Sequence, residues 1–386
     1  MVFCFSIICQ YSIKLYLLTD FMKKILRLFI PVIFVSFFWG CNSDDPDNEL
    51  TYSTPINEKS VSLEQVDTIV LNAGDHLFGK FREGLMIDSS GEILSFADDG
   101  NQLIYLFSRQ GDLMNVIGGT GSGPEEFLQI SGYFVENDRL VVVDESQFIV
   151  KVFHIDGTLM NTFSLFENQN MYINSRDIFV DEDTLYIQIL EADKFHDRTN
   201  SKLIARYDLS TATLIDLIGQ FEPFLNDANS YLTLHNFTID TNSNRLISTL
   251  VSSSRIQVFD LQRSDKVSHF VSTSSFWKNR EEKIDPSMPR REIIRRTTDT
   301  SYSTGIFVTD SYILNHIQTL TDAWMKTSDY LSKENYVSVY NSTGSEYYGT
   351  AELPGTLGDV HQEQLYIIED FNPDKFTIGV YEIARK

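Results

Sequence analysis

Short apolar runs that alternate with polar residues recur along this chain in groups of four, and this grouping constrains the fold more than any other feature. The first group runs through residues 84–87, 93–98, 103–107 and 113–117, separated by turns rich in Gly, Asp, Asn and Ser. The second group repeats the pattern at 133–135, 140–144, 148–154 and 159–163. Such alternation indicates β-strands. A four-strand unit that repeats at about 45 residues has the period of a propeller blade.

Four weaker groups follow, beginning near residues 177, 237, 305 and 365. The last group is about one strand short, and the run from Val66 to Leu71 can supply that strand from the start of the domain. A single four-stranded sheet cannot bury both of its faces, whereas a closed ring of sheets buries them against one another. The sequence therefore predicts an all-β fold over residues 61–386. It is a six-bladed β-propeller of four-stranded antiparallel blades, closed by an N-terminal strand that completes the last blade.

A glycine-rich motif joins the first two groups. Residues Gly119 to Phe127 read GTGSGPEEF, and a strand, a strand ending in Asp and a strand ending in an aromatic residue follow. This arrangement resembles the six-bladed β-propeller lipoproteins of Bacteroidetes, which in turn resemble NHL-repeat and TolB-like propellers. The resemblance covers the chain from Leu63 to Ile383. That family is largely uncharacterised, so the resemblance implies a fold and a location more than an activity.

The N-terminal segment carries a targeting pattern. Lys23 and Lys24 precede an apolar stretch, and the small residue Gly40 stands directly before Cys41, as in a secretory signal peptide. We predict that residues 1–21 are a mis-called extension, that residues 22–40 are a lipoprotein signal peptide and that Cys41 is acylated. A permanent membrane anchor and a cleaved soluble protein are the alternatives. The apolar stretch is short for an anchor, because a bilayer core takes roughly 20 helical residues.

Residues 41–60 begin with a run of acidic and turn-forming residues, which predicts an acidic flexible tether. The acidic residues behind Cys41 also resemble the export signal of surface lipoproteins in Bacteroidetes-type bacteria, with an ordinary tether as the alternative. The expected location is therefore extracytoplasmic, at the outer membrane or the cell surface. The expected attachment to the membrane is through lipid on Cys41.

Charge and cysteine content exclude several classes of function. The formal net charge is −23, and a strongly acidic surface repels nucleic-acid phosphates, so no nucleic-acid partner is expected. The three cysteines, Cys4, Cys9 and Cys41, all lie at or before the predicted acylation site. The mature domain therefore has neither a disulfide nor a cysteine nucleophile.

Acidic residues in matching places predict a binding rim at one end of the ring. Asp98 and Asp144 each end the second strand of a group, and the loops that follow share a face with the glycine linker and its Glu125 and Glu126. A cation, a sugar hydroxyl or a basic peptide suits such a rim. The alternative is that the aspartates cap tight turns by bonding their own backbone. We interpret the glycine motif itself as a link between blades, with Phe127 in the core.

Catalytic and metal-binding motifs are weak in this chain. The histidines are scattered, with no pair at the helical spacing of zinc proteases. His235 with Asn236, and Asn315 with His316, are the polar pairs predicted at the inner rim. Propeller lactonases hold a metal with Glu, Asn and Asp from different blades, and the sequence leaves open such a trio with a single divalent cation in the channel. No cofactor is predicted, and no residue is assigned as catalytic or as a metal ligand.

A basic insertion interrupts the blade period at residues 275–300. It predicts a lid that grips an anionic ligand, or a contact point for a partner, with a solvated loop as the alternative. The residues proposed for the lid are Arg290, Arg291, Arg295 and Arg296.

Fold and location together favour a binding module. We expect a lipid-anchored propeller that binds a glycan, a peptide or a protein partner, in the setting of nutrient uptake. A propeller enzyme, such as a hydrolase, lactonase or lyase with a site at the mouth of the central channel, is the alternative. A purely structural or assembly role is the third hypothesis.

Overall fold

The chain is described from a computed structural model. The residues described are 51–52, 54–55, 61–72, 74, 76–79, 81–165, 171–191, 201–220, 235–263, 266–271, 276–278, 288–289, 292, 300–327, 330–372 and 375–385. Cys41, the predicted signal peptide and the four lid arginines lie outside this set.

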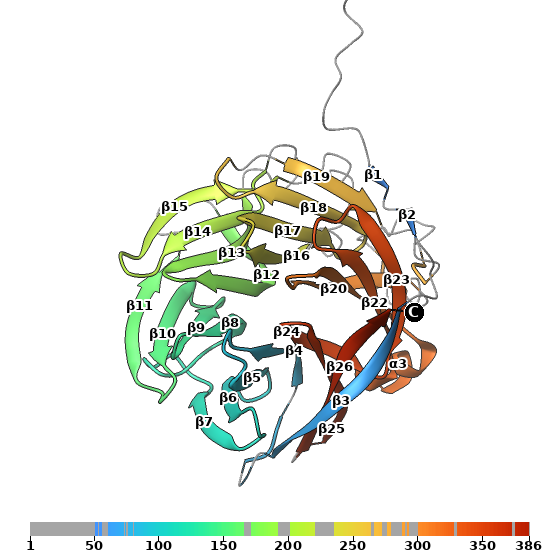
Figure 1. The fold of residues 1–386 in the computed structure, drawn as a ribbon. Coiled ribbons are helices and arrows are strands. Elements are labelled where there is room, and N and C mark those ends of the chain that lie inside the picture. The colour runs from blue at the N-terminus through green and yellow to red at the C-terminus, as the bar shows by residue number, and fades with distance from the viewer. Residues whose placement is uncertain are drawn as a thin grey trace, which may run out of the picture. The chain divides into compact units, whose positions relative to one another are not determined.

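Six antiparallel sheets surround a common axis, and each contains four consecutive strands of the ring (Figure 1). The first three blades are β4 (Phe81–Ile87), β5 (Ile93–Asp98), β6 (Leu103–Ser108) and β7 (Leu113–Gly118); β8 (Ile130–Glu136), β9 (Arg139–Asp144), β10 (Ile149–His154) and β11 (Leu159–Ser164); and β12 (Met171–Asp181), β13 (Thr184–Glu191), β14 (Ile204–Asp208) and β15 (Thr213–Ile218).

The last three blades follow the same order from the axis outward. They are β16 (His235–Asp240), β17 (Arg245–Leu250), β18 (Arg255–Asp260) and β19 (Lys266–Val271); β20 (Ser301–Val308), β21 (Tyr312–Thr319), β22 (Glu334–Asn341) and β23 (Glu346–Leu353); and β24 (Thr356–His361), β25 (Gln364–Asn372), β26 (Lys375–Arg385) and β3 (Val61–Asn72). Between β21 and β22 lie helix α3 (Asp322–Thr327) and the 3₁₀ turn η4 (Tyr330–Ser332). None of the helices among the described residues has the length and apolar character needed to cross a bilayer.

The ring closes where the two ends of the domain meet. Strand β3 pairs antiparallel with β26 along its whole length, with Ile69 opposite Ile378. The predicted fold is therefore confirmed, and the closing strand is longer at both ends than the run from Val66 to Leu71. An N-terminal strand that completes the last blade ties the two ends of the chain together with a ladder of backbone hydrogen bonds.

Two short strands add to the outer edges of two blades. β1 (Thr51–Tyr52) pairs parallel with β19, and β2 (Thr54–Pro55) pairs parallel with β23. These residues lie in the stretch that the sequence assigned to the tether. The outermost strand of a blade has an unpaired edge that accepts another strand, which accounts for the difference.

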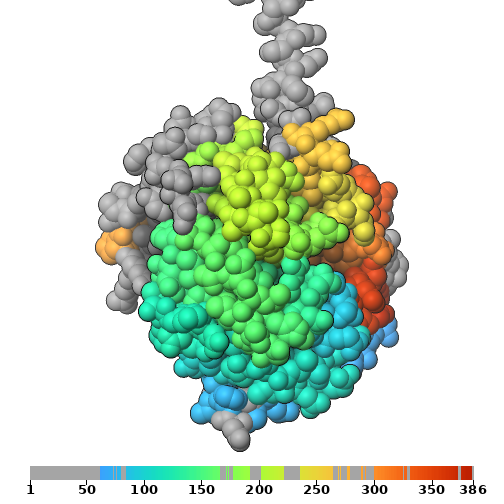
Figure 2. All heavy atoms as spheres, turned by 90° about the vertical axis from the view of Figure 1, so that its left-hand side faces the viewer, coloured from blue at the N-terminus to red at the C-terminus, as the bar shows by residue number. Residues whose placement is uncertain are grey.

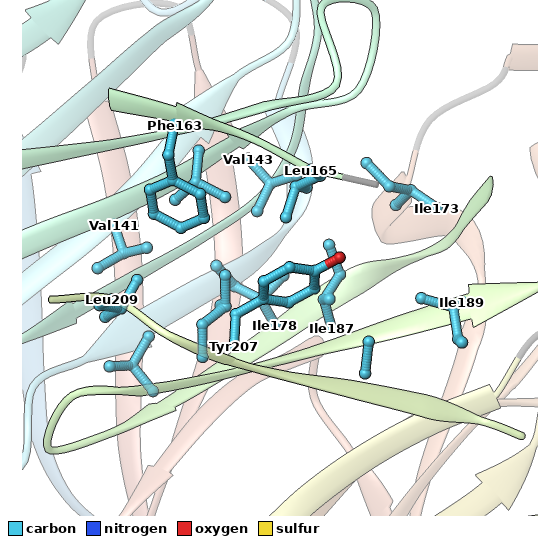
Figure 3. Packing of buried hydrophobic residues seen from close by; sticks show 14 of the residues in the cluster. Val141, Val143, Phe163, Leu165, Ile173, Ile178, Ile187, Ile189, Tyr207 and Leu209 are labelled. Carbon is cyan, nitrogen blue, oxygen red and sulfur yellow. The ribbon is translucent and has the colours of Figure 1, made fainter. Parts of the chain in front are cut away.

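The core of the ring lies between neighbouring blades. One cluster of buried apolar residues fills each of the six junctions. At the junction of the second and third blades, Val141 and Val143 of β9 face Ile178 of β12 and Ile187 of β13 (Figure 3). Burial of each such side chain stabilises the fold by about 1.5–3 kcal/mol. Seen from the side, these two blades are in contact along the outer wall of the ring (Figure 2).

Candidate functional site

The inner strands of the six blades bound a central cavity of about 690 Å³. Residues of β4, β8, β12, β16, β20 and β24 line it, and these strands surround the axis in Figure 1. A volume of this size is typical of pockets that bind small molecules or short chain segments. The cavity is therefore the candidate functional site.

Strand register divides the wall of this channel into levels. Side chains alternate along a strand, so residues two apart on an inner strand face the axis together. In each blade, one residue close to the turn-side end of the inner strand belongs to a middle level of the channel wall. These residues are Met86, Phe134, Phe179, Thr238, Phe307 and Asp359. All six line the cavity.

The middle level is an apolar collar with two polar members. The rings of Phe134 and Phe179 pack with centroids 4.9 Å apart. Met86 lies against the neighbouring blade, with its sulfur 3.3 Å from the backbone nitrogen of Val135. Thr238 and Asp359 complete the collar, so a ligand at this level would meet aromatic surface and one carboxyl group.

The next level, at the end of the inner strands, is the mouth of the channel and is acidic. Its six positions hold Asp88, Glu136, Asp181, Asp240, Thr309 and His361. Among the described residues that line the whole cavity there is no Lys or Arg. The carboxylates of the lining are Asp88, Glu136, Asp177, Asp181, Glu182, Asp240, Asp310 and Asp359. Low-dielectric walls that carry one sign of charge concentrate the opposite charge, so the channel favours a cation.

These carboxylates differ in the hydrogen bonds and ion pairs that they already form within the protein. Asp88 accepts hydrogen bonds from the backbone nitrogens of Glu92 (2.9 Å) and Ile93 (2.8 Å). Asp240 forms an ion pair with Arg245. By contrast, no donor among the described residues hydrogen-bonds to the side chain of Asp181. Burial, together with the neighbouring charge of Glu182, raises the pKa of Asp181. Asp181 is thus the mouth carboxylate with the most unused capacity for a ligand.

Asp359 occupies the seam between the last and first blades. A bulge between Leu357 and Asp359 displaces the pairing of β24, and the carboxylate accepts bonds from the backbone nitrogens of Ile87 (2.7 Å) and Val360 (2.7 Å). The side chain of Asp359 is half-buried and lines the cavity. Burial raises the pKa of Asp359 to about 7, although the two backbone donors act in the opposite direction. The carboxyl group therefore changes charge near neutral pH.

Beyond the collar, away from the mouth, Gly84, Gly132 and Gly305 take three of the positions at the next level. The place of a side chain is open at Gly84, whereas the ring of Phe307 occupies it at Gly305. Polar side chains cluster close to this level in the fourth and fifth blades. Asn236 donates to the backbone oxygen of Ser303 (2.8 Å), and Ser303 donates to Asn315 (2.6 Å). The hydroxyl of Thr304 bonds to His316 (2.9 Å).

The structure thus brings two of the four predicted inner-rim residues together. Asn236 and Asn315 meet at the junction of the fourth and fifth blades through Ser303. His316, the next residue on β21, lies on the opposite face of the blade, toward the sixth blade, and lines the cavity. His235, at the start of β16, is buried.

The predicted acidic rim lies at the other end of the blades. Asp98 and Asp144 are fully buried, and their oxygens accept backbone hydrogen bonds from Gly79 (2.7 Å) and Leu128 (2.8 Å). Asp98 also accepts from Gly100 (2.8 Å), within its own turn. These contacts match the turn-capping alternative. Both carboxylates tie a loop to the incoming link between blades.

The glycine motif is a compact link between the first two blades. Phe127 is fully buried in the core of that junction, as predicted. The ammonium group of the buried Lys151 donates to the backbone oxygens of Gly123 (2.8 Å) and Glu126 and lies 5.2 Å from the ring centroid of Phe127. Glu125 and Glu126 are exposed beside this loop, and Glu126 accepts a bond from the backbone nitrogen of Gly123 (2.9 Å).

In the part of the chain that the structure describes, no three His, Cys, Asp or Glu side chains come together as a metal site would require, either in the channel or elsewhere.

The acidic mouth is the part of the candidate site that the sequence analysis did not predict. A signal for it exists, because Asp88, Glu136, Asp181 and Asp240 each stand at the end of an inner strand, directly before a turn. That pattern becomes a ring only once the innermost strand of each blade is known.

Comparison with known proteins supports the fold. A family model described as "6-bladed beta-propeller" matches residues 85–165, which span the first two blades. A solved structure of a DUF4221 family member from Bacteroides vulgatus is 14% identical, with 86% of this chain and 100% of that chain covered and a TM-score of 0.66. A Bacteroides fragilis protein described as predicted to be exported is 15% identical, with 87% and 99% covered and a TM-score of 0.52. No curated protein matches the chain.

At these identities the structural likeness shows the fold alone. The resemblance to six-bladed propellers of Bacteroides-type bacteria, which the glycine motif predicted, is thereby confirmed.

Proposed function

We propose that this protein is a binding module that holds a cationic ligand in its central channel. The observation that carries the proposal is the charge of the channel wall, where eight carboxylates and neither Lys nor Arg appear among the described lining residues. The aromatic collar behind the mouth adds apolar surface that suits the alkyl part of an organic cation. Of the three ligand classes expected from the sequence, a basic peptide or protein segment fits this wall better than a neutral glycan.

Direct binding measurements test this proposal. Isothermal titration calorimetry would compare three probes on the full domain: a lysine hexapeptide, a glutamate hexapeptide and maltohexaose. We expect the lysine peptide alone to bind, with an affinity that falls as salt rises, because exposed charges are screened within about 8–10 Å at physiological ionic strength. Binding of maltohexaose, or equal binding of both peptides, would overturn the proposal.

We also propose that the protein works outside the cytoplasm, attached by lipid on Cys41, where a binding module would serve nutrient capture. The signal-like stretch before Cys41 supports this location. So does the description of the Bacteroides fragilis relative as predicted to be exported. Metabolic labelling with radioactive palmitate tests it. Label should appear on the native chain and vanish in Cys41→Ser, and a native chain that stays unlabelled in the soluble fraction would contradict the lipid anchor.

Asp359 supports a second candidate function, that of a propeller enzyme. A carboxyl group whose pKa is near 7 can accept and return a proton at neutral pH. In this alternative Asp359 is the general acid or base of a hydrolase or lyase. A screen of ester, lactone and glycoside substrates tests it, since any genuine turnover should drop at least a hundredfold in Asp359→Asn.

A further inference from the structure

A histidine from a second strand reaches the wall of the channel in the fifth blade. His316 lies on β21, where its partner on the inner strand is Gly305, and a bulge between Ser303 and Gly305 turns Thr304 toward it. Because Gly305 has no side chain, the ring of His316 lines the cavity beside Thr304. The ring is almost fully buried, and Thr304 is half-buried.

The hydrogen bonds around the imidazole of His316 have a fixed donor and acceptor at each step. The ammonium group of Lys333 donates to Oε1 of Gln318 (3.0 Å), so the amide nitrogen of Gln318 is the atom that donates to Oδ1 of Asn335 (3.0 Å). The amide nitrogen of Asn335 in turn donates to the backbone oxygen of Lys333 (3.1 Å). Lysine has only donors, and these contacts fix the orientation of both amides. Oδ1 of Asn335 is therefore an acceptor.

Because Oδ1 of Asn335 is an acceptor, the position of the imidazole hydrogen of His316 follows. Nε2 of the ring lies 3.2 Å from Oδ1 of Asn335, so Nε2 must carry the hydrogen. Burial lowers the pKa of His316 to about 3, so the ring is neutral and its Nδ1 has no proton. Nδ1 then accepts from the hydroxyl of Thr304, at 2.9 Å. The single hydroxyl proton of Thr304 is used inside the wall, so its oxygen can take part in any further hydrogen bond only as an acceptor.

We propose that Thr304 is a specificity-determining hydrogen-bond acceptor. Through it the channel selects primary ammonium groups, which can donate a hydrogen bond, over quaternary ammonium groups, which cannot. This inference rests on the proposed function and refines it. The mouth carboxylates and the aromatic collar attract both kinds of cation. The Thr304 oxygen stabilises only a ligand with an N–H, because a trimethylated nitrogen has none.

A matched pair of dications tests the inference. Hexane-1,6-diamine and hexamethonium have the same six-carbon spacer and the same charge, and only the first can donate. Calorimetry on the native domain should show the diamine binding about tenfold more tightly or better, the usual contribution of a hydrogen bond to a charged group. In Thr304→Val the diamine should lose that advantage, while the affinity for hexamethonium stays unchanged.

Two variants serve as controls. Thr304→Ser keeps the hydroxyl and should restore the preference for the diamine. Thr162→Val removes an exposed hydroxyl on β11, outside the channel, and should leave the ratio of the two affinities unchanged.

The outcomes separate the two proposals. If the diamine binds but Thr304→Val does not change the ratio, this inference is overturned and the acidic channel stands. If neither dication binds the native domain, the proposed function fails and this inference fails with it. Nitrogen NMR of the imidazole gives a readout that needs no ligand and no variant. A proton on Nε2 of His316 is expected, and a proton on Nδ1 would overturn the assignment of Thr304 as an acceptor.

Discussion

The junction between the second and third blades differs sharply from the junction between the fourth and fifth. The first buries sixteen apolar side chains among the described residues, and the second buries eight. At the second junction Asn236, Ser303 and Asn315 form a buried polar chain. Thr304 and His316 form a second polar contact on the opposite face of the fifth blade.

A buried polar group that is fully hydrogen-bonded contributes little net stability, and leaving its partner unsatisfied costs about 1–3 kcal/mol. The comparison therefore indicates two roles within one repeat architecture. The apolar junction holds the ring together, and the polar junction joins two inner strands, β16 and β20, by a buried hydrogen bond.

The largest effect should come from the apolar junction. Ile187→Ala removes a fully buried side chain, and we expect a loss of about 3 kcal/mol in the free energy of unfolding, measured by urea denaturation. Ile215→Ala, at a position 50% exposed on β15, should change stability by less than about 0.5 kcal/mol. Equal losses in the two variants would contradict the assignment of the core to the blade junctions.

A change at His316, on the opposite face of the fifth blade from this polar junction, should cost less stability but alter recognition. His316→Leu keeps a similar volume and leaves the Thr304 hydroxyl without its acceptor, so we expect a loss of about 1–2 kcal/mol. The ratio of diamine to hexamethonium affinity should also fall. His154→Leu, at a side chain that is 46% exposed on β10, should change neither quantity. A stability loss without any change in the ratio would limit His316 to a structural role.

Asp359 should make cation binding depend on pH. Its pKa of about 7 means that the carboxyl group is neutral below that value and charged above it. Affinity for the diamine should therefore rise about tenfold between pH 6 and pH 8, and Asp359→Asn should flatten the profile.

Folding stability should show the opposite trend with pH. The pKa of Asp359 is higher in the folded chain than the ordinary value of 3.8, so the folded chain binds the proton more tightly. The free energy of unfolding should then fall as pH rises from about 4 to about 7. Profiles of affinity and stability that match those of Asp359→Asn would show that Asp359 does not titrate in this range.

A substitution at the mouth of the channel should have the smallest effect on affinity. Asp181→Asn removes one carboxylate of several, and we expect the affinity for the diamine to fall about threefold at low salt and less at high salt. Glu125→Gln removes an exposed charge at the other end of the blades and should have no effect. The same loss in both variants would point to bulk charge instead of the channel as the source of attraction.

Much of the ring follows from local sequence. Alternating apolar runs marked the strands, and the strand missing from the last group indicated that Val66 to Leu71 closes the ring, as β3 does. The outer strands of the fourth and fifth blades, β19 and β23, were harder to predict. In β23 the three consecutive residues Gly349 to Ala351 are all buried, so buried and exposed positions do not alternate strictly along the strand.

The site depends on contacts that no local pattern records. Asp359 has its raised pKa because the first blade packs against β24 and buries the carboxyl group, with the backbone nitrogen of Ile87 as one of its donors. The proton of His316 is placed by Asn335, which lies 19 residues later on another strand. Asp98 and Asp144 have the composition of a binding rim, yet their bonds to Gly79 and Leu128 occupy them in joining loops.

A crystal structure of the domain with hexane-1,6-diamine would test the central claim most directly. The account predicts that the diamine lies in the channel, with an ammonium nitrogen within hydrogen-bond distance of Oγ1 of Thr304 and the chain against the collar of Phe134, Phe179 and Phe307. A channel that stays empty at saturating diamine, or a diamine bound only on the outer surface of the ring, would contradict it.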